Sequence, residues 1–136
     1  MRALGLDIGS KRIGVAISDP LGLIAFPHSC IYHKNEESDA EEIYSLAKSR
    51  EAETIVIGIP YSLDGSLGPQ AKTVEKFYQF MKNYGDLPVV TWDERFSTAD
   101  AINRIKETGM TKIKDKSIID ATAAAIILQS YLDSQA

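Results

Sequence analysis

A hairpin opens the chain, because residues 3–18 read Ala-Leu-Gly-Leu-Asp-Ile-Gly-Ser-Lys-Arg-Ile-Gly-Val-Ala-Ile-Ser. Two apolar runs, residues 3–8 and 13–18, flank a polar turn of residues 9–12. A turn this short joins antiparallel strands. A third strand is expected over residues 23–32, where Pro27 favours an edge position because proline cannot donate a ladder hydrogen bond. The chain therefore starts with a three-stranded antiparallel meander.

Helices and strands alternate in the rest of the chain. Helical spacing of apolar residues predicts helices from a capping box over 38–41, from Pro69 to Gly85, and from Ser117 to Leu132. Apolar runs predict buried strands over 54–59 and 88–92, and a short helix over 98–108 precedes a basic loop over 110–116. Because helical crossovers make these strands parallel to the first, the expected fold is α/β. It is a single domain over residues 1–136, a mixed five-stranded sheet with helices on both faces.

Composition excludes several classes of protein. Hydrophobic residues make up 44% and charged residues 25%, as in a globular protein, and no apolar run is long enough to cross a bilayer. Cys30 is the single cysteine, which excludes an internal disulfide and favours a reducing cytoplasm. Asp7 and Gly9 interrupt the early apolar stretch, so no secretory signal is predicted. We expect a cytoplasmic protein with no membrane partner.

Charge is unevenly distributed along the chain, although the net charge is only −4. Residues 36–53 contain seven acidic and two basic residues, whereas residues 95–116 contain six basic and three acidic ones. The net charge argues against a surface coated in basic residues. The basic region is able to face a polyanion, and solvated helix faces explain the same charges equally well.

Three acidic residues stand at the ends of buried elements. Asp7 interrupts the first strand, Glu94 follows the last strand, and Asp120 lies in the first turn of the C-terminal helix. Functional groups collect at the carboxyl ends of parallel strands, so we expect Asp7 and Glu94 to lie together. When carboxylates share a site, the negative charge of one raises the pKa of another, unless a cation lies among them. Hard oxygen ligands favour Mg²⁺ or Mn²⁺ as that cation.

Each acid also has a purely structural interpretation. Asp7 could accept hydrogen bonds from the nearby turn amides. Glu94 could pair with Arg95 or cap the helix that follows. Asp120 could form a capping box with Ser117 and favour the helix dipole. Three acids in one cleft favour the metal site over three separate coincidences.

Four blocks of the sequence resemble the YqgF family. They are residues 4–19, residues 58–70 (Gly-Ile-Pro-Tyr-Ser-Leu-Asp-Gly-Ser-Leu-Gly-Pro-Gln), residues 93–98 (Asp-Glu-Arg-Phe-Ser-Thr) and residues 119–132. The blocks occur in the family's order and cover the chain from end to end. Members are described as pre-16S rRNA nucleases and as Holliday-junction-resolvase-like proteins of the ribonuclease H superfamily. Two departures, at residues 61–62 and 96–97, change none of the acids.

The resemblance implies a ribonuclease H-like fold and a metal-dependent nuclease. Asp7, Glu94 and Asp120 would be both the catalytic residues and the ligands of Mg²⁺ or Mn²⁺. The implied substrate is structured RNA, the 5′ end of pre-16S ribosomal RNA in pre-ribosomal particles, with branched DNA as an older proposal. Both a monomer and a dimer remain open. The residues expected to bind substrate phosphate are Ser10, Lys11, Arg12, Arg95, Lys112, Lys114 and Lys116.

Two functions of other classes also remain open. Residues 7–10 and 15–19 resemble the phosphate-binding hairpin of the actin, sugar-kinase and chaperone ATPases. Those proteins clamp a nucleotide between two such domains, and 136 residues supply one. The second alternative is a ribonuclease H-like module that binds RNA or protein without cleaving it. A complete set of acids argues against such a decayed site.

Overall fold

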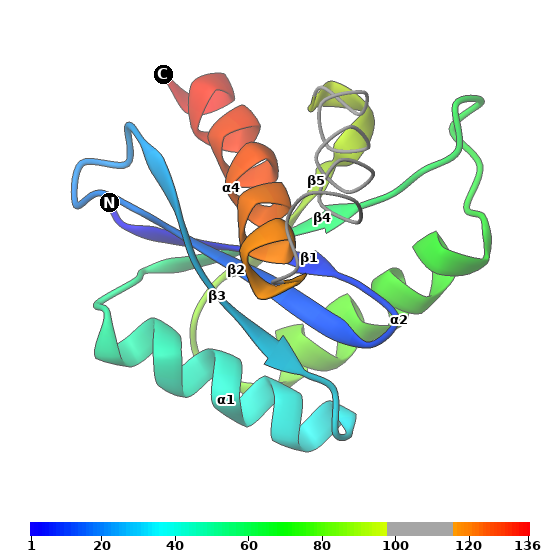
Figure 1. The fold of residues 1–136 in the computed structure, drawn as a ribbon, viewed down its shortest axis with the longest axis horizontal. Coiled ribbons are helices and arrows are strands. Elements are labelled where there is room, and N and C mark those ends of the chain that lie inside the picture. Colours follow the sequence, from blue (N-terminus) through cyan, green and yellow to red (C-terminus); the bar gives the residue numbers. More distant parts are fainter. Residues whose placement is uncertain (98–115) are drawn as a thin grey trace.

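Five strands form one mixed sheet in the order β3-β2-β1-β4-β5 (Figure 1). The structure is a computed structural model that describes residues 1–97 and 116–136. β1 pairs antiparallel with β2 and β2 antiparallel with β3, whereas β4 lies parallel to β1 and β5 parallel to β4. The predicted hairpin, the mixed sheet and the edge position of Pro27 are confirmed. The strands are β1 (Ala3–Ile8), β2 (Arg12–Ser18), β3 (Ala25–Tyr32), β4 (Thr54–Ile59) and β5 (Val89–Asp93).

Helices cover both faces of this sheet (Figure 1). α1 (Glu36–Ser49) and α2 (Pro69–Tyr84) share one core with the strands, in which Ile43 and Phe77 pack with Leu6. α4 (Lys116–Gln135) crosses the other face, where Leu128 packs with Val56. A short 3₁₀ helix, η1 (Glu94–Phe96), follows β5. The period-2 alternation of each strand therefore separates two cores, and α4 covers the face that carries Asp7.

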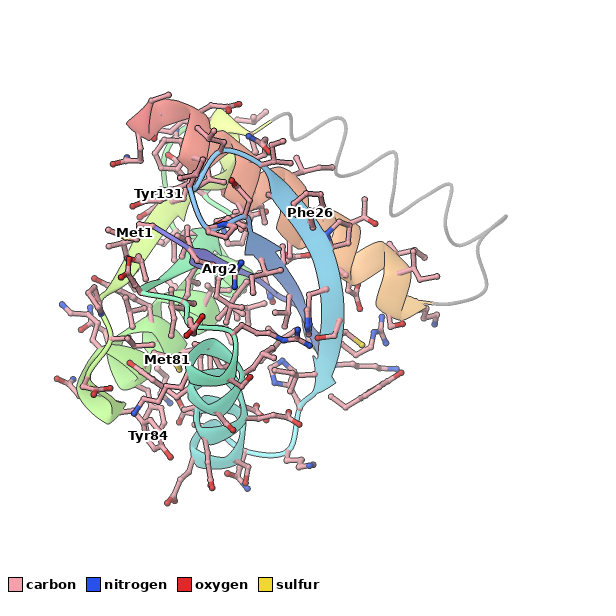
Figure 2. All side chains as sticks on the ribbon, turned by 90° about the vertical axis from the view of Figure 1, so that its left-hand side faces the viewer. Met1, Arg2, Phe26, Met81, Tyr84 and Tyr131 are labelled. Carbon is pink, nitrogen blue, oxygen red and sulfur yellow. The ribbon has the colours of Figure 1, made fainter. Side chains whose placement is uncertain are left out.

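The edge strand β3 leaves part of its apolar surface exposed. Phe26, on this strand, is 50% exposed (Figure 2).

No helix within residues 1–97 and 116–136 has the length and apolar character that a membrane span requires.

α1 begins earlier than the predicted capping box at Ser38. Asn35 is the N-cap, because its side-chain oxygen accepts a hydrogen bond from the Ser38 N–H at 2.8 Å. The carboxylate of Asp39, which lies within α1, accepts a hydrogen bond from the Lys34 N–H at 3.0 Å and contacts the His33 ring at 2.8 Å. The predicted cap was wrong because Asn35, three residues upstream, reaches the first amides of the helix.

α4 begins at Lys116, so the basic loop predicted over 110–116 is wrong at its last residue. Ser117 and Asp120 both lie within the helix, and its first turn contains no acidic residue. The predicted capping box fails because Asp120 bonds Arg12 instead. The predicted helix over 98–108 and the loop residues Lys112 and Lys114 lie outside the described residues.

Glycines let α4 lie directly against the strands. A Cβ atom added at Gly14 of β2 would overlap the carbonyl oxygen of Asp120. One added at Gly5 of β1 would lie 2.7 Å from the Cβ of Leu128, closer than side chains pack. At Asp120 and at Leu128, α4 therefore contacts strand backbone that carries no side chain.

Candidate active site

Asp7 lies on the α4 face of the sheet between two glycines. Asp7 is only 6% exposed, and it pairs with Gly14 of β2. On the other side β4 runs parallel to β1, with Leu6 paired to Ile57, the residue before Gly58. The two glycines carry no side chain, and α4 and Glu94 lie directly over them.

The other two acids lie over these two glycines. A Cβ atom at Gly14 would be 3.1 Å from the Cβ of Asp120, and one at Gly58 would be 3.1 Å from the Cγ of Glu94. The structure thus places the three acids in one row, with Asp7 in the middle. They come from β1, from η1 and from α4.

The carboxylate of Asp120 forms an ion pair with Arg12. The Arg12 Nε lies 2.6 Å from Asp120 Oδ2, and the two side chains are 20% and 16% exposed. The hydrogen bond to this carboxylate raises the pKa of Arg12 above its ordinary value. In the part of the chain that the structure describes, no three His, Cys, Asp or Glu side chains are arranged to hold one ion. The backbone of Asp120 therefore lies in the row, whereas its carboxylate binds the guanidinium of Arg12.

A pocket of about 370 Å³ adjoins this ion pair. The hairpin turn and the start of α4 form its walls, so residues more than 100 positions apart in the sequence meet there. Two amines, a guanidinium and a hydroxyl can bind a phosphate group beside the acids. The lining residues are Gly9, Ser10, Lys11, Arg12, Lys116, Ile119 and Asp120.

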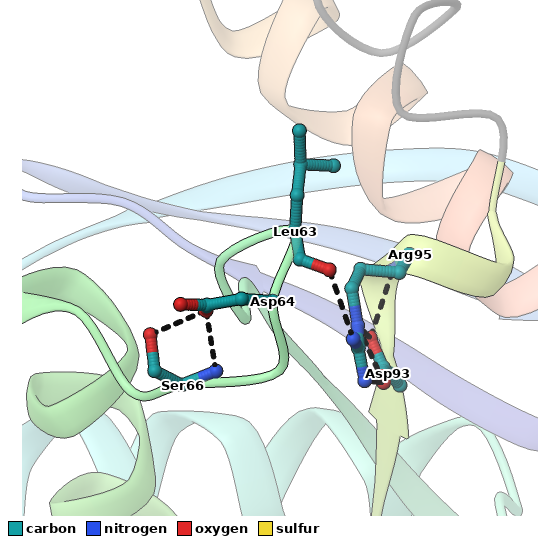
Figure 3. Close-up of polar contacts among 5 residues, drawn as sticks. All are labelled: Leu63, Asp64, Ser66, Asp93 and Arg95. Atoms are coloured by element: carbon teal, nitrogen blue, oxygen red, sulfur yellow. Dashed lines mark hydrogen bonds and ion pairs between the residues drawn. The ribbon is translucent and has the colours of Figure 1, made fainter.

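Arg95 does not line this pocket, and its guanidinium binds the Asp93 carboxylate (Figure 3). Its Nη2 and Nε donate to the Asp93 carboxylate at 2.6 and 3.0 Å, and its guanidinium lies 5.5 Å from the centroid of the Tyr61 ring. Asp93 also caps η1 by accepting from the Arg95 N–H at 2.9 Å. Asp93 therefore forms the ion pair with Arg95 that the structural interpretation offered to Glu94, whereas the helix expected over 98–108, which Glu94 could cap, lies outside the described residues.

The same guanidinium connects β5 to the loop between β4 and α2. Its Nη1 donates to the Leu63 carbonyl at 3.5 Å (Figure 3). The loop closes on itself, since Asp64 Oδ1 accepts from the Ser66 N–H at 2.9 Å and from its hydroxyl at 2.6 Å. Leu63 is 94% exposed at the tip of this loop. Arg95 thus fixes an exposed loop next to the element that carries Glu94.

Replacing Arg95 with glutamine should lower stability in a pH-dependent way. Hydrogen bonds from Arg95 hold the pKa of Asp93 below its ordinary value, so the pair stabilises the folded protein above the unfolded pKa of about 3.9. That contribution is lost as the pH falls through the folded pKa. The difference in denaturant midpoint between parent and Arg95→Gln should therefore be largest at neutral pH and shrink as the pH falls through the folded pKa of Asp93. In an Asp93→Asn background the Arg95 change removes only the contacts with Leu63 and Tyr61, so its cost should be smaller and should not follow this pH dependence. A difference between parent and Arg95→Gln that is constant with pH would contradict the assignment.

The sequence analysis gave His33 no role, yet it braces the hairpin turn. Its Nε2 lies 2.8 Å from the Gly9 carbonyl oxygen, and its Nδ1 lies 2.8 Å from Asp39 Oδ2. Gln70 supports the same turn by donating to the Ile8 carbonyl at 2.9 Å. The register of β2 and β3 is the signal that would have found His33, because it places the end of β3 beside Arg12.

Comparisons with known proteins agree on one family and one fold. The family model described as "RuvX: Holliday junction resolvase" matches residues 1–134. A relative from Halothermothrix orenii is 46% identical over 135 residues, covering 99% of this chain and 96% of its own length. One from Clostridium kluyveri is 44% identical over 133 residues, covering 98% and 97%. Both are named "Putative pre-16S rRNA nuclease".

Two solved structures similar to this chain are resolvases. The fowlpox virus Holliday junction resolvase superposes with a TM-score of 0.60 at 16% identity, covering 100% of both chains. Thermus thermophilus RuvC in complex with a Holliday junction substrate gives 0.56 at 12% identity, covering 99% of this chain and 95% of its own. The likeness confirms the predicted ribonuclease H-like fold class.

Proposed function

The chain belongs to the RuvX family of Holliday junction resolvases, and from this membership we propose that it is a nuclease acting on the 5′ end of pre-16S ribosomal RNA. The names of its relatives support this substrate, and the description of the family supports branched DNA as the alternative. The reaction in either case is hydrolysis of a phosphodiester bond.

One observation carries the proposal: the row of Glu94, Asp7 and Asp120 over Gly58 and Gly14. These three acids come from distant parts of the sequence, yet they lie over neighbouring positions on one face of the sheet.

The donor atoms of the row suit a divalent cation in their chemistry, although the Asp120 carboxylate is turned to Arg12. These donors are carboxylate oxygens, the ligands that Mg²⁺ and Mn²⁺ prefer, so we assign Asp7, Glu94 and Asp120 as both metal ligands and catalytic residues. An ion held there supplies an activated water and stabilises charge on the leaving oxygen of a phosphodiester. Magnesium and manganese are both compatible with this donor set.

The pocket beside the row is suited to binding substrate phosphate. Ser10 offers a hydroxyl, and Lys11 and Lys116 offer ammonium groups from opposite walls. Positive groups near a phosphate neutralise its charge and fix the position of the backbone without reading base sequence. We assign Lys112 and Lys114 to the flanking backbone because they continue the basic stretch that ends at Lys116. Arg95, bonded to Asp93, contributes through the loop it holds.

We propose that residues 1–136 act as a single domain on pre-ribosomal particles. The single cysteine suits a reducing compartment, and we therefore propose the cytoplasm as the location. We propose no membrane partner.

A cleavage assay with two substrates tests the function. The purified protein is incubated with Mg²⁺ or Mn²⁺ and either a 16S precursor fragment carrying its 5′ extension or a four-way DNA junction. Cleavage of the RNA at the 5′ extension, absent in Glu94→Gln, is the expected result. Cleavage of the junction alone would assign branched DNA as the substrate. A parent protein that binds either substrate without cleaving it would support the non-catalytic module.

A further inference from the structure

The ion pair of Arg12 and Asp120 occupies a carboxylate that the proposed metal site also needs. Oδ2 of Asp120 accepts the Arg12 Nε–H at 2.6 Å, a short, charge-assisted hydrogen bond. The Cβ of the same residue lies over Gly14, next to Asp7. Asp120 is thus on the row of acids by its backbone and bound to Arg12 by its carboxylate.

A charge-assisted hydrogen bond from Arg12 Nε to Asp120 Oδ2 holds this pair together. A stronger cation is the kind of agent that can displace Arg12 from Asp120. Both side chains are partly accessible, at 20% and 16% exposure, so the pair can open without unfolding.

Once released, Arg12 has a second place to bind. It lines the pocket of about 370 Å³ together with Ser10, Lys11 and Lys116. A phosphate in this pocket would offer the guanidinium two oxygens in a geometry that matches its donors. The pocket and the acid row adjoin through Asp120, which belongs to both.

We propose that Arg12 is an exchange residue, which binds Asp120 in the protein alone and substrate phosphate when a divalent cation takes Asp120. The proposal rests on the proposed function, since it uses the same acids and the same substrate class. It makes cation and nucleic acid bind cooperatively: each weakens the pair of Arg12 and Asp120 and so lowers the cost of binding the other. Arg12 also blocks the third carboxylate when substrate is absent.

Manganese binding without nucleic acid is the first test. Arg12→Gln should bind Mn²⁺ about fivefold or more tightly than the parent, measured by calorimetry or by water-proton relaxation, because no guanidinium competes for Asp120. Lys11→Gln is the matched control, since it removes an equal charge from the same turn and pocket without breaking the pair. Equal Mn²⁺ affinities for the two variants would overturn the exchange.

Nucleic-acid binding without divalent cations is the second test. Asp120→Asn should tighten binding of the RNA in the presence of a chelator more than Asp7→Asn does, although both remove one negative charge. The extra gain should vanish in the double variant Arg12→Gln/Asp120→Asn, because the released guanidinium is then absent. Equal gains for the two single variants, or a gain that survives in the double variant, would overturn the proposal.

Neither test measures cleavage, so its outcome is separate from that of the proposed function. If Glu94→Gln abolishes cleavage while the Arg12 tests give equal values, the nuclease stands and the exchange fails. If both tests succeed while the parent cleaves nothing, the exchange describes a binding module.

Discussion

Replacing Asp7 with asparagine should reduce nuclease activity by about 10³-fold or more, because several kcal/mol of metal-derived stabilisation of the transition state are lost. Asparagine matches aspartate in size and keeps one oxygen, so the packing between β2, β4 and α4 should persist. Asp7 is the middle acid of the row, and a neutral amide there weakens binding of any cation that the row holds. Cleavage rates and Mn²⁺ binding measure the two effects together.

The control for Asp7→Asn is Asp86→Asn. Asp86 carries the same charge, but its side chain is 77% exposed and pairs with Lys48 at 3.3 Å, outside the acid row. Its activity should equal that of the parent. An Asp7→Asn protein that cleaves as fast as the parent, or that binds Mn²⁺ as well, would place the reaction elsewhere.

Replacing Gly14 with alanine should cost about 3 kcal/mol of unfolding free energy, at the upper end of what overpacking a core costs. The new methyl group would overlap the carbonyl of Asp120, a backbone atom that cannot rotate away. α4 must therefore shift away from β2, which exposes apolar contacts and also moves the Asp120 carboxylate. Equilibrium denaturation measures the loss, and cleavage should fall even at temperatures where the variant is folded.

Gly68→Ala provides the matched control for Gly14→Ala. A Cβ there meets only the Ser62 hydroxyl oxygen at 3.4 Å, an ordinary contact. Because Gly68 is the N-cap of α2 and alanine is a poorer cap, a loss of about 1 kcal/mol or less is expected. Similar losses for the two variants would show that the close approach of α4 to β2 is not a constraint on stability.

Local patterns predicted the architecture because each one depends on few residues. The turn over 9–12 determines the hairpin by its length, and the apolar run over 54–59 marks a strand buried on both faces. Helix starts were less predictable, since Asn35 and Ser38 are both acceptable caps and only the three-dimensional path of the chain decides between them.

The environment of the acids was predicted only in part. Their common location follows from topology, because Asp7 and Glu94 stand at the carboxyl ends of parallel strands. The partner of Asp120 could not be predicted in this way. Arg12 lies 108 residues away in the sequence and pairs with Asp120 only once α4 has packed on β2. The bond between Arg95 and Asp93 is local, but Asp93 and Glu94 carry the same charge and both lie close to Arg95 in the sequence, so the sequence does not decide which of them pairs with it.

The two glycines beside Asp7 bear on how a genetic screen of this protein would be interpreted. A screen that scores only survival or turnover would group variants of Gly14 and Gly58 with variants of the acids, although neither glycine contributes a chemical group. The amount of protein in the cell separates the two kinds, because destabilised chains are removed by proteases whereas an inactive but folded one accumulates. A low amount of protein for Gly14 variants and a normal amount for Asp7 variants would distinguish residues that allow α4 to pack on the sheet from residues that carry out the reaction.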